Sequence, residues 1–486
     1  MLTASSTRTL LVVAQIALLT LSACSSTPSK TPLSTLSSAP STALEAVFTV
    51  QAEGQRAVVR ALTRSPVCPG IAWDEKTARP MTVRAMPATV PVRGDGAQTD
   101  NKPAIFDVLT CEATWPADAL GGRIAGRDVP APKAEIKRIV IIADTGCRMK
   151  ASENAFQPCN NAQLWPFAQV AQSAAAKKPD LVIHIGDIHY RESPCPQANP
   201  ACANSPWGYG YDAWQADLFK PARPLLEAAP WVFVRGNHEA CFRAGQGWFR
   251  FVDSQPWSEA RSCNDPKFDQ DADYSNPYAV AITPNTQLVV FDSAKTSGKP
   301  FAVTDPAYGK YKTQMLQVGQ LAQQKTHSFF ISHHPLLAIA PGRETGKIKP
   351  GGNAGLQSVF ESMHPKRLFP DGIDVSMHGH LHYFEAISFK TAHPASLVMG
   401  NSASANEGSI PTSLPPETQA YPGAIVEDYA ATAAYGFATL DRVGAGASSS
   451  WLLTEYTAAG QPVFRCAIQG GKSRCTAVAL ASAPPT

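Results

Sequence analysis

The chain of 486 residues lacks several features that mark common classes of protein. Its formal net charge is only +3 and it has no long run of lysine or arginine, which argues against nucleic-acid binding. It has no Cys-x-x-Cys pair, which argues against a zinc finger, and no repeat of roughly 20 to 50 residues, which argues against a solenoid or propeller. With 44% hydrophobic residues, it is long enough to bury a large core and to form more than one domain.

The start of the chain also lacks an apolar run long enough to be a convincing membrane span. One basic residue, Arg8, precedes the apolar run 10–21, which leads into Leu21-Ser22-Ala23-Cys24, as is typical of an export signal with a small-residue cleavage site. These four residues resemble the lipobox of bacterial lipoproteins, in which the cysteine is acylated and becomes the new N-terminus. Ser25 after that cysteine favours, by the same resemblance, the outer membrane. We therefore expect an exported lipoprotein anchored through Cys24 and facing the periplasm or the cell surface; an ordinary secretory signal that contains a cysteine is the alternative.

The sequence contains eleven cysteines, and an odd number in an exported protein needs an explanation. Lipidation of Cys24 would leave ten, an even number that suits an oxidising compartment. We predict five disulfides, although the sequence does not determine which cysteines pair. The neighbours along the chain are Cys68 with Cys111, Cys147 with Cys159, Cys195 with Cys202, Cys241 with Cys263, and Cys466 with Cys475.

Composition divides the chain into four segments. Residues 1–23 read as the signal peptide, and residues 24–44 as a flexible tether, because they are rich in Ser, Thr, Pro and Ala and poor in bulky apolar groups. Residues 45–132 contain short β-prone pieces such as 81–84 and 105–109, interrupted by Pro, Gly and Asp, which predict a small β-rich module. The proline-rich stretch 129–133 reads as a linker to the main domain, residues 133–486.

In that main domain, apolar runs of strand length alternate with helical patterns. Their continuous apolar character predicts strands that are covered on both faces, and each leads into a polar motif. These runs are Ile139–Ala143, Leu181–Ile185, Trp231–Val234, Phe329–Ile331 and Ile373–Met377. We expect helices over 162–178, with Leu164, Phe167, Ala168 and Ala171 on one face, and over 211–229, which two prolines divide. Further strands are expected at 435–439, 451–456 and 463–468. Such alternation predicts an α/β fold with functional residues at the carboxyl ends of strands.

Five motifs follow these runs. They are Asp144-Thr145-Gly146, Gly186-Asp187-Ile188-His189-Tyr190, Gly236-Asn237-His238-Glu239, Phe330-Ile331-Ser332-His333 and Gly379-His380-Leu381-His382. In this order they resemble the motifs of the calcineurin-like metallophosphoesterase superfamily, and within it most closely those of the purple acid phosphatases. The resemblance covers about residues 137–383 and implies a β-sandwich flanked by helices, with the small β-rich module before it. Phe330 replaces a valine that is not a ligand in the family, so little depends on it. Most of the superfamily has a histidine ligand where Gly146 stands, and Tyr190 supplies the replacement.

The resemblance also implies two metal sites. Asp144, Asp187, Tyr190 and His382 would hold one ion, and Asp187 as a bridge, Asn237, His333 and His380 would hold the other. A phenol, whose ordinary pKa is about 10, needs a strong Lewis acid to ionise at neutral or acidic pH, so Tyr190 favours Fe(III). The remaining carboxylate, amide and imidazole donors suit a divalent iron, zinc or manganese ion. Three anionic ligands against five positive charges would leave a surplus that can bind hydroxide and an anionic phosphoester.

Such a pair of ions, about 3.5–4 Å apart, can activate water and stabilise both oxygens of an in-line displacement at phosphorus. We expect His238 to be the general acid on the leaving oxygen and Glu239 to orient it, although His238 could be only a structural neighbour. The predicted function is hydrolysis of phosphomonoesters on small organic substrates. A phosphodiesterase on the same site is the alternative, and a non-catalytic binding lipoprotein is a third hypothesis, against which the complete ligand set argues.

The other polar and aromatic residues near the motifs have simpler interpretations. His184, inside an apolar strand, is expected to be a buried core residue, whereas His189, His334 and His378 are expected to support the ligands or touch substrate. The basic residues Arg343, Lys347 and Lys349 could face the phosphate or form a solvated loop. The aromatic segments 195–214 and 241–257 could line a substrate cleft or pack beneath disulfide-linked loops.

Overall fold

The computed structural model describes residues 43–93, 102–342, 347–406, 408–444 and 450–479, all within one compact unit, Ser38–Thr486. The predicted signal peptide, Cys24 and the tether up to residue 42 lie outside the described residues, as does Arg343. Export and lipid anchoring therefore stay predictions. Among the described residues, no helix combines the length and the apolar character that crossing a membrane requires.

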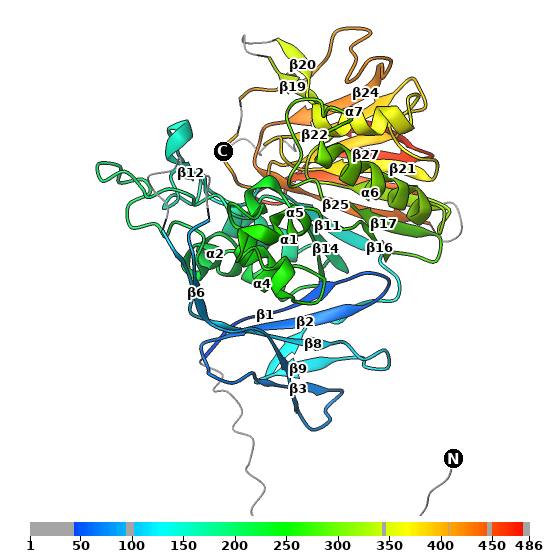
Figure 1. Ribbon diagram of the computed structural model, residues 1–486. Helices are drawn as coiled ribbons and strands as arrows, with labels where there is room; N and C mark the ends of the chain where they lie inside the picture. Colours follow the sequence, from blue (N-terminus) through cyan, green and yellow to red (C-terminus); the bar gives the residue numbers. More distant parts are fainter. Residues whose placement is uncertain (1–42, 94–101, 343–346, 407, 445–449, 480–486) are drawn as a thin grey trace, which may run out of the picture. The chain divides into compact units, whose positions relative to one another are not determined.

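The first large sheet joins three of the predicted strands to strands from both ends of the chain (Figure 1). Its order is β28 (Lys472–Ala477), β27 (Pro462–Gln469), β26 (Ser450–Thr457), β25 (Gly436–Val443), β11 (Arg138–Ile142), β14 (Leu181–Ile185), β15 (Trp231–Val234), β1 (Leu44–Gln51), β2 (Ala57–Thr63), β8 (Leu109–Thr114) and β5 (Thr82–Ala85). The four strands β11, β14, β15 and β1 run parallel, with Ile139 opposite Leu181 and Ile185 opposite Val234. The three strands expected near the C-terminus are confirmed as β25, β26 and β27.

The second large sheet contains the other two predicted strands. Its order is β16 (Tyr278–Ala281), β17 (Thr286–Val290), β18 (His327–Ile331), β21 (Ile373–His378), β23 (Ala395–Met399), β22 (Phe384–Phe389) and β24 (Val426–Thr432). Strands β17, β18, β21 and β23 are parallel to one another, and Ile331 lies opposite Met377. The continuous apolar runs are thus strands whose two faces are both covered, as expected.

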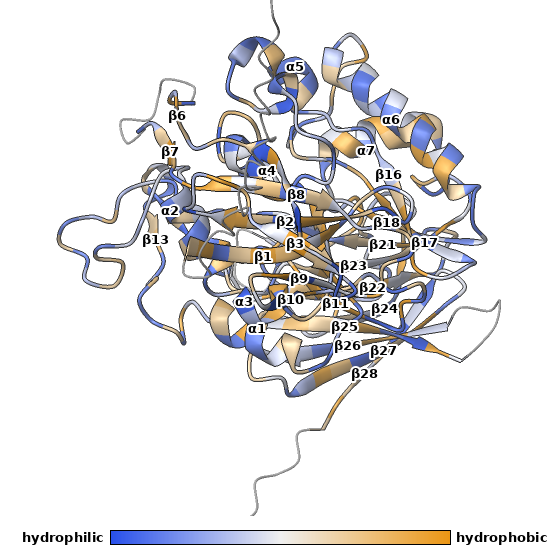
Figure 2. Ribbon diagram, turned by 90° about the horizontal axis from the view of Figure 1, so that it is seen from below, coloured by the Kyte–Doolittle hydropathy of each residue, from blue (hydrophilic) through white to orange (hydrophobic). Residues whose placement is uncertain are grey.

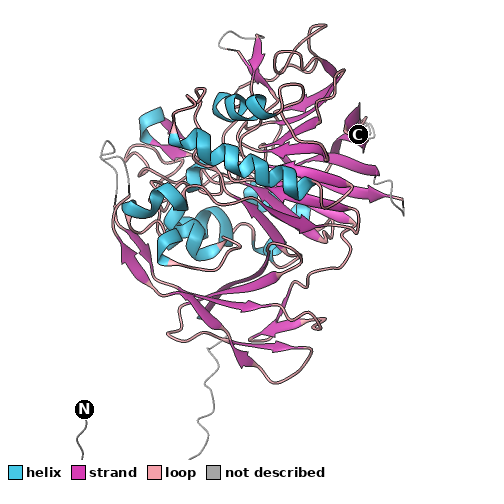
Figure 3. Ribbon diagram, turned by 45° about the vertical axis from the view of Figure 1, so that its right-hand side comes forward, coloured by secondary structure: helices cyan, strands magenta, loops and turns pink. Residues whose placement is uncertain are grey.

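The two sheets pack face to face, and helices cover their outer faces. Side chains of β11, β14 and β15 share one buried cluster with side chains of β17, β18 and β21. A second cluster joins helices α1 to α4 to the outer face of β11, β14 and β1, and a third joins α6 and α7 to β17, β18 and β21. Figure 3 shows the helices gathered against the strands, and Figure 2 shows that α6 carries both hydrophilic and hydrophobic residues. This arrangement confirms the predicted α/β sandwich flanked by helices.

The helices are shorter than the sequence pattern suggests. They are α1 (Phe167–Ala175), α2 (Tyr211–Trp214), α3 (Arg223–Leu226), α4 (Gly245–Phe251), α5 (Asp269–Ala272), α6 (Pro306–Ala322) and α7 (Ala354–Met363), with a π-helical turn at Gln215–Phe219 and 3-10 turns at Ala151–Glu153, Asn237–Glu239, Glu259–Arg261 and Pro266–Phe268. The expectation that Leu164 shares a helical face with Phe167, Ala168 and Ala171 is wrong, since Leu164 precedes α1 and is 49% exposed. The Asn161 side chain caps a turn there by accepting the Leu164 N–H, and α1 begins only after Pro166.

The N-terminal β-rich region has its own small core. Beyond β1, β2, β5 and β8, it forms a sheet of β10 (Arg127–Val129), β9 (Gly122–Ile124), β3 (Gly70–Trp73) and β4 (Arg79–Pro80), and a hairpin of β6 (Ala88–Val90) and β7 (Ala104–Phe106). Val47, Ile71 and Trp115 pack in one cluster with the Cys111 side chain. Because β1 also pairs with β15, this region shares a sheet with the strands that carry the motifs. The boundary near residue 132 stays a prediction.

All five predicted disulfides are present, and each joins sequence neighbours. They are Cys68–Cys111, Cys147–Cys159, Cys195–Cys202, Cys241–Cys263 and Cys466–Cys475. The last pair joins β27 to β28 across the turn at Gly470 and Gly471. The remaining strands form two short hairpins. One pairs β12 (Met149–Lys150) with β13 (Ala155–Phe156), and the other pairs β19 (Ile339–Pro341) with β20 (Ile348–Pro350).

Candidate metal centre

The five motifs lie where parallel strands of the two sheets end. The Asp144 N–H donates to the carbonyl of Gly186, which joins the first two motifs within one sheet. The His333 Nδ1 lies 2.8 Å from the carbonyl of Ile185, which joins the second sheet to the first. The carboxyl ends of strands in an open α/β sheet are a common place for such polar groups to meet.

Three of the predicted ligands adopt a left-handed backbone. Asp144 has φ 54°, Asp187 has φ 53° and His380 has φ 73°. Such a conformation costs a non-glycine residue about 1–3 kcal/mol, and it persists only where the surrounding structure holds it in place, which is common at functional sites. The glycine at 236 allows the loops to approach closely, because a Cβ there would lie 2.1 Å from the Asp187 Oδ1.

The first group of side chains converges on the hydroxyl of Tyr190. Its Oη lies 3.0 Å from the Asp144 Oδ1, 2.9 Å from the Asp187 Oδ2 and 2.8 Å from the His382 Nε2. The His382 Nδ1 lies 2.6 Å from the carbonyl of Ala405, which can only accept a hydrogen bond. The Nε2 lone pair of His382 is therefore directed at the phenol and the two carboxylates.

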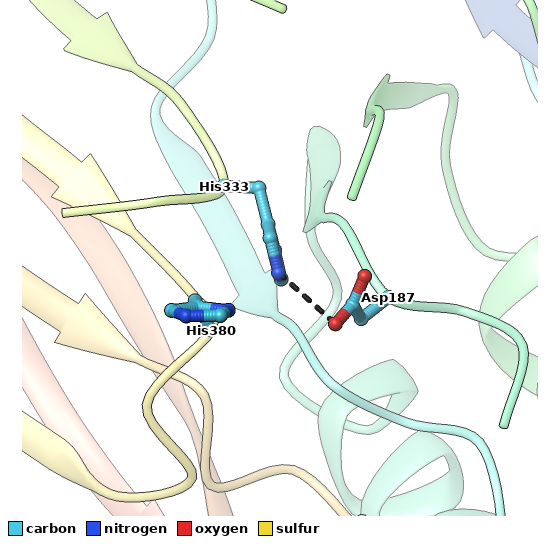
Figure 4. A group of neighbouring side chains, drawn as sticks. All are labelled: Asp187, His333 and His380. Carbon is cyan, nitrogen blue, oxygen red and sulfur yellow. Dashed lines mark ion pairs between the residues drawn. The ribbon is translucent and has the colours of Figure 1, made fainter. Parts of the chain in front are cut away.

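The second group includes Asp187, His333 and His380 (Figure 4). The His333 Nε2 is 3.1 Å from the Asp187 Oδ2, and possible ligand atoms of Asp187, His333 and His380 all lie within 4.8 Å of one another. The Oδ1 of Asn237 is buried and has no hydrogen-bond partner among the described residues. A buried amide oxygen without a partner costs about 1–3 kcal/mol, which makes a cation ligand a physical reason for its position.

Burial and charge at Tyr190 also fit a cation. Burial raises the pKa of the phenol well above its ordinary value of 10.0, and the carboxylates of Asp187 and Asp144 raise that pKa further. Burial would also raise the pKa of the Asp187 carboxyl, but His333 and His238 lower it well below 3.8 overall. Ionised carboxylates and imidazole nitrogens around a phenol form a donor set that suits metal ions.

His238 lies beside both groups and has a carboxylate partner. Its Nε2 is 3.8 Å from the Asp187 Oδ2, and its ring centroid is 3.9 Å from that of Tyr190. Its Nδ1 is 2.6 Å from the Oε1 of Glu192, and the guanidinium of Arg243 contacts both Glu192 and the ring of His238. Glu192 and Arg243 therefore hold the imidazole in place.

The expected role of Glu239 in orienting His238 is wrong. The fully buried Glu239 carboxylate instead accepts hydrogen bonds from the backbone N–H groups of residues 187, 188, 189 and 236, at 2.9 to 3.0 Å. The three bonds from residues 187, 188 and 189 fix the loop that carries Asp187 to the loop that carries Asn237, and the bond from Gly236 closes the latter loop on itself. The sequence position of Glu239, next to His238, was misleading, because successive side chains on a tight 3-10 turn point in different directions.

The model of the calcineurin-like phosphoesterase family matches residues 137–384, about half of the chain. The chain belongs to the calcineurin-like phosphoesterase family. Membership makes this protein a metallophosphoesterase and implies a dinuclear metal site.

Two solved structures are similar to this phosphoesterase. A purple acid phosphatase from yellow lupin (Lupinus luteus) seeds has a TM-score of 0.50 at 15% identity, over 89% of this chain and 74% of that one. A structure of PhoD has a TM-score of 0.50 at 12% identity, over 92% of this chain and 94% of that one. At such identities these likenesses show the fold. No curated protein matches the sequence.

Four further histidines of the phosphoesterase lie beside the motifs and have polar partners of their own. His184 is fully buried, its Nε2 lies 2.9 Å from the Thr145 Oγ1, and its ring stacks on Trp231, so the core interpretation is confirmed. His189 and His334 are buried and bonded to the Gly208 carbonyl and to Ser293, respectively. The His378 Nδ1 lies 3.1 Å from the Ser332 hydroxyl.

The sequence interpretation missed three charged residues that position the site. Besides Glu192 and Arg243, the buried carboxylate of Asp217 accepts the backbone N–H groups of Cys147 and Tyr190 and pairs with Arg191. Glu192 lies two residues after Tyr190 in a motif loop, which is the one local signal that could have found it. The aromatic segments pack mainly in the core, where Trp214, Trp248 and Phe249 belong to one buried cluster.

Proposed function

We propose that this phosphoesterase hydrolyses phosphomonoesters of small organic substrates, as acid phosphatases do, with Fe(III) and a divalent ion. The observation that carries the proposal is the Tyr190 hydroxyl, which lies within 3.0 Å of two carboxylates and an imidazole. Because the protein surroundings alone raise the pKa of this phenol, a strong Lewis acid is needed to ionise it. That requirement favours a ferric ion over a site with divalent ions only.

Each of the two groups of side chains would hold one metal ion. Asp144, Asp187, Tyr190 and His382 would hold Fe(III), and Asp187, Asn237, His333 and His380 would hold iron, zinc or manganese in the divalent state. When bound, the pair supplies an activated water and stabilises charge on the phosphoryl oxygens.

The chain's own residues would bind the ester and hold a proton. His238 would supply the proton for the leaving oxygen. Glu192, at the Nδ1, and Arg243, whose Nη2 lies 2.6 Å from the Nδ1 and 2.8 Å from the Nε2, keep the ring in place. Glu239 keeps the two motif loops at a constant separation through its three hydrogen bonds to the backbone of residues 187, 188 and 189. The burial of Asp144, Asp187 and His333 limits access of bulk water, which strengthens the electrostatic interactions there.

We also propose that the enzyme is exported and anchored to the outer membrane through a lipid on Cys24. Five disulfides support an oxidising compartment, since such bonds are rare in the cytosol. Mass spectrometry of the mature N-terminus tests this: an acylated Cys24 is expected, and an unmodified residue there would contradict the anchor.

Metal analysis and an absorption spectrum of periplasm-expressed protein test the metal assignment. We expect two metal ions per chain, one of them iron, and a visible phenolate-to-iron charge-transfer band that Tyr190→Phe abolishes. A matched control is Tyr211→Phe, because Tyr211 is a buried tyrosine outside the motifs. A colourless, fully active enzyme with only divalent ions would refute the ferric site.

The choice of substrate is tested by comparing p-nitrophenyl phosphate with its bis-ester. We expect kcat/KM for the monoester to exceed that for the diester. The opposite order would favour a phosphodiesterase. Less than one metal ion per chain together with no activity on either ester would favour a non-catalytic binding protein.

A further inference from the structure

The loop after β17 lies beside the second group of the metal centre and carries a lysine, Lys295. Because β17 runs parallel to β18, with Val290 opposite Ile331, the chain after β17 emerges at the edge where His333 and His334 lie. The Ser293 Oγ accepts the backbone N–H of His334 at 3.1 Å and lies 3.1 Å from its Nδ1. The His334 ring centroid is 4.2 Å from that of His380, and Lys295 follows Ser293 by two residues.

A phenylalanine on the loop after His238 meets this lysine. Phe242 directly precedes Arg243, which contacts the His238 ring, and the Lys295 Nζ lies 4.4 Å from the Phe242 ring centroid. Asp273 joins the same two loops, because its Oδ1 accepts the Cys241 N–H at 2.8 Å and its Oδ2 lies 3.7 Å from the Lys295 Nζ. Lys295 and Phe242 therefore link the loop of the proposed general acid to the loop beside the second group.

The ammonium of Lys295 is positioned but still accessible. Its side chain is 41% exposed, and its ion pair with Asp273 is long. The neighbouring cation Arg243, by contrast, is buried in an ion pair with Glu192. An ammonium group has three donors, so a contact with an aromatic ring and one distant carboxylate leaves capacity for another anion.

We propose that Lys295, held in place by Phe242, is a specificity-determining residue that receives a second anionic group of the substrate. The preferred substrates are then small phosphomonoesters that carry a carboxylate or another anion near the ester. That the recognised molecule is a substrate rests on the proposed monoester hydrolysis. Recognition of its second anionic group by Lys295 concerns binding alone. A phosphate bound at the two metal groups would place its organic part toward the edge where the two loops meet.

Binding of non-hydrolysable ligands to the holoenzyme tests the proposal by calorimetry. The probes are 2-carboxyethylphosphonate and propylphosphonate, which share a chain length and differ in the terminal charge. We expect the wild-type protein to bind the carboxylated ligand roughly 5-fold more tightly, the size of one modest ion pair. Lys295→Met should abolish this preference, and Lys295→Glu should reverse it.

A second cation–π pair in the same protein provides the matched control. The Lys267 Nζ lies 4.7 Å from the Phe268 ring centroid and pairs with Asp265 of its own segment. Lys267→Met should retain the wild-type ratio of dissociation constants, whereas Phe242→Leu should reduce it, because the ammonium loses its support. A ratio that Lys295→Met and Lys295→Glu leave unchanged, including equal weakening of both ligands, would overturn the proposal.

The same experiment separates the two hypotheses. A protein that shows the charge preference in binding but hydrolyses no monoester refutes the proposed function and supports the role of Lys295. A protein that hydrolyses monoesters but binds both phosphonates equally well refutes the role of Lys295 alone.

Discussion

The two halves of the metal centre differ in how closely their polar atoms approach one another, and in the first half a single O–H faces three acceptors. In the first half, the Tyr190 hydroxyl has three polar partners at 2.8 to 3.0 Å, and its side chain is 2% exposed. In the second half, the Asn237 Oδ1 has no hydrogen-bond partner among the described residues, and His380 is only partly buried.

The two halves are therefore suited to different metal ions. Three oxygen ligands that can be anionic, all buried, are suited to retaining a highly charged ion. Neutral imidazole and amide donors at a more open edge are suited to an ion that exchanges and faces substrate. Phe242 and Lys295 lie at this second edge, where the organic part of a phosphoester would be recognised.

Asp187 belongs to both halves, so its replacement should have the largest effect. We expect Asp187→Asn to lower kcat/KM by more than roughly 1,000-fold and to remove both metals, since an amide is a weaker bridge than a carboxylate. Elemental analysis and p-nitrophenyl phosphate turnover measure this. Full retention of either metal would show that Asp187 is not shared between the two sites.

Replacing His380 should affect the second half of the metal centre and leave the first half intact. We expect His380→Ala to lose the divalent ion and most of the activity while keeping the iron and the charge-transfer band, because its contacts belong to the second group. Iron content and the absorption spectrum are the measurements. Loss of the band in this variant would show that the two halves do not bind their metals independently.

The proposed general acid has a pH dependence that Glu192 should modify. Burial and Arg243 lower the pKa of His238 below 6.5, whereas Asp187 and Glu192 act in the opposite direction. Activity that needs protonated His238 is therefore lost as pH rises through a pKa below 6.5. Glu192→Gln removes one raising influence, so the alkaline limb of the kcat/KM profile should move to lower pH, with roughly 10-fold lower kcat.

Glu227→Gln is the matched control for this variant, because Glu227 forms a surface ion pair with Arg223. Its pH profile should match that of the wild-type protein. An alkaline limb that Glu192→Gln does not move would contradict the assigned role of Glu192.

A buried carboxyl outside the metal centre should give the smallest effect. Burial raises the pKa of Glu455 well above 4.5, and its Oε1 accepts a hydrogen bond from the Asn401 amide at 2.8 Å. The folded state then holds a proton that the unfolded state releases, so this group makes the protein less stable as pH rises above about 4.5. The carboxylate of Asp187 has the opposite tendency, because cationic groups surround it.

Glu455→Gln keeps the acceptor and removes the titration. Its melting temperature relative to the wild-type protein should increase by about 1 °C between pH 5 and pH 8, as an effect of about 1 kcal/mol would produce in a chain of this length. Glu427→Gln, at an exposed ion pair with Arg474, should show no such increase. A constant difference for Glu455→Gln across this pH range would mean that Glu455 does not remain protonated.

The sequence predicted strands and disulfides correctly, because the local residue pattern there agrees with the tertiary structure. The five apolar runs were found as strands because burial on both faces leaves a continuous apolar signature, and the five disulfides follow from neighbouring cysteines. Helix ends were predicted less well, since the turn at Asn161 and Pro166 interrupts a pattern that still looks helical. The assignments of metal ligands stay predictions that the metal analysis tests, although the structure brings those side chains together.

The amino-acid sequence by itself determined the class of fold and the set of candidate ligands. The reason is that residues of metal-binding types directly follow the apolar runs that form strands. Only the tertiary structure decided that Glu192 and Arg243, rather than Glu239, hold His238, and that Lys295 meets Phe242 at the edge of the site. The physical reason is that a hydrogen bond or a cation–π contact depends on the direction of a side chain in space. Glu192 and Arg243, 51 positions apart, meet because β14 and β15 pair in one sheet, whereas Lys295 and Phe242 meet only because the two sheets pack together.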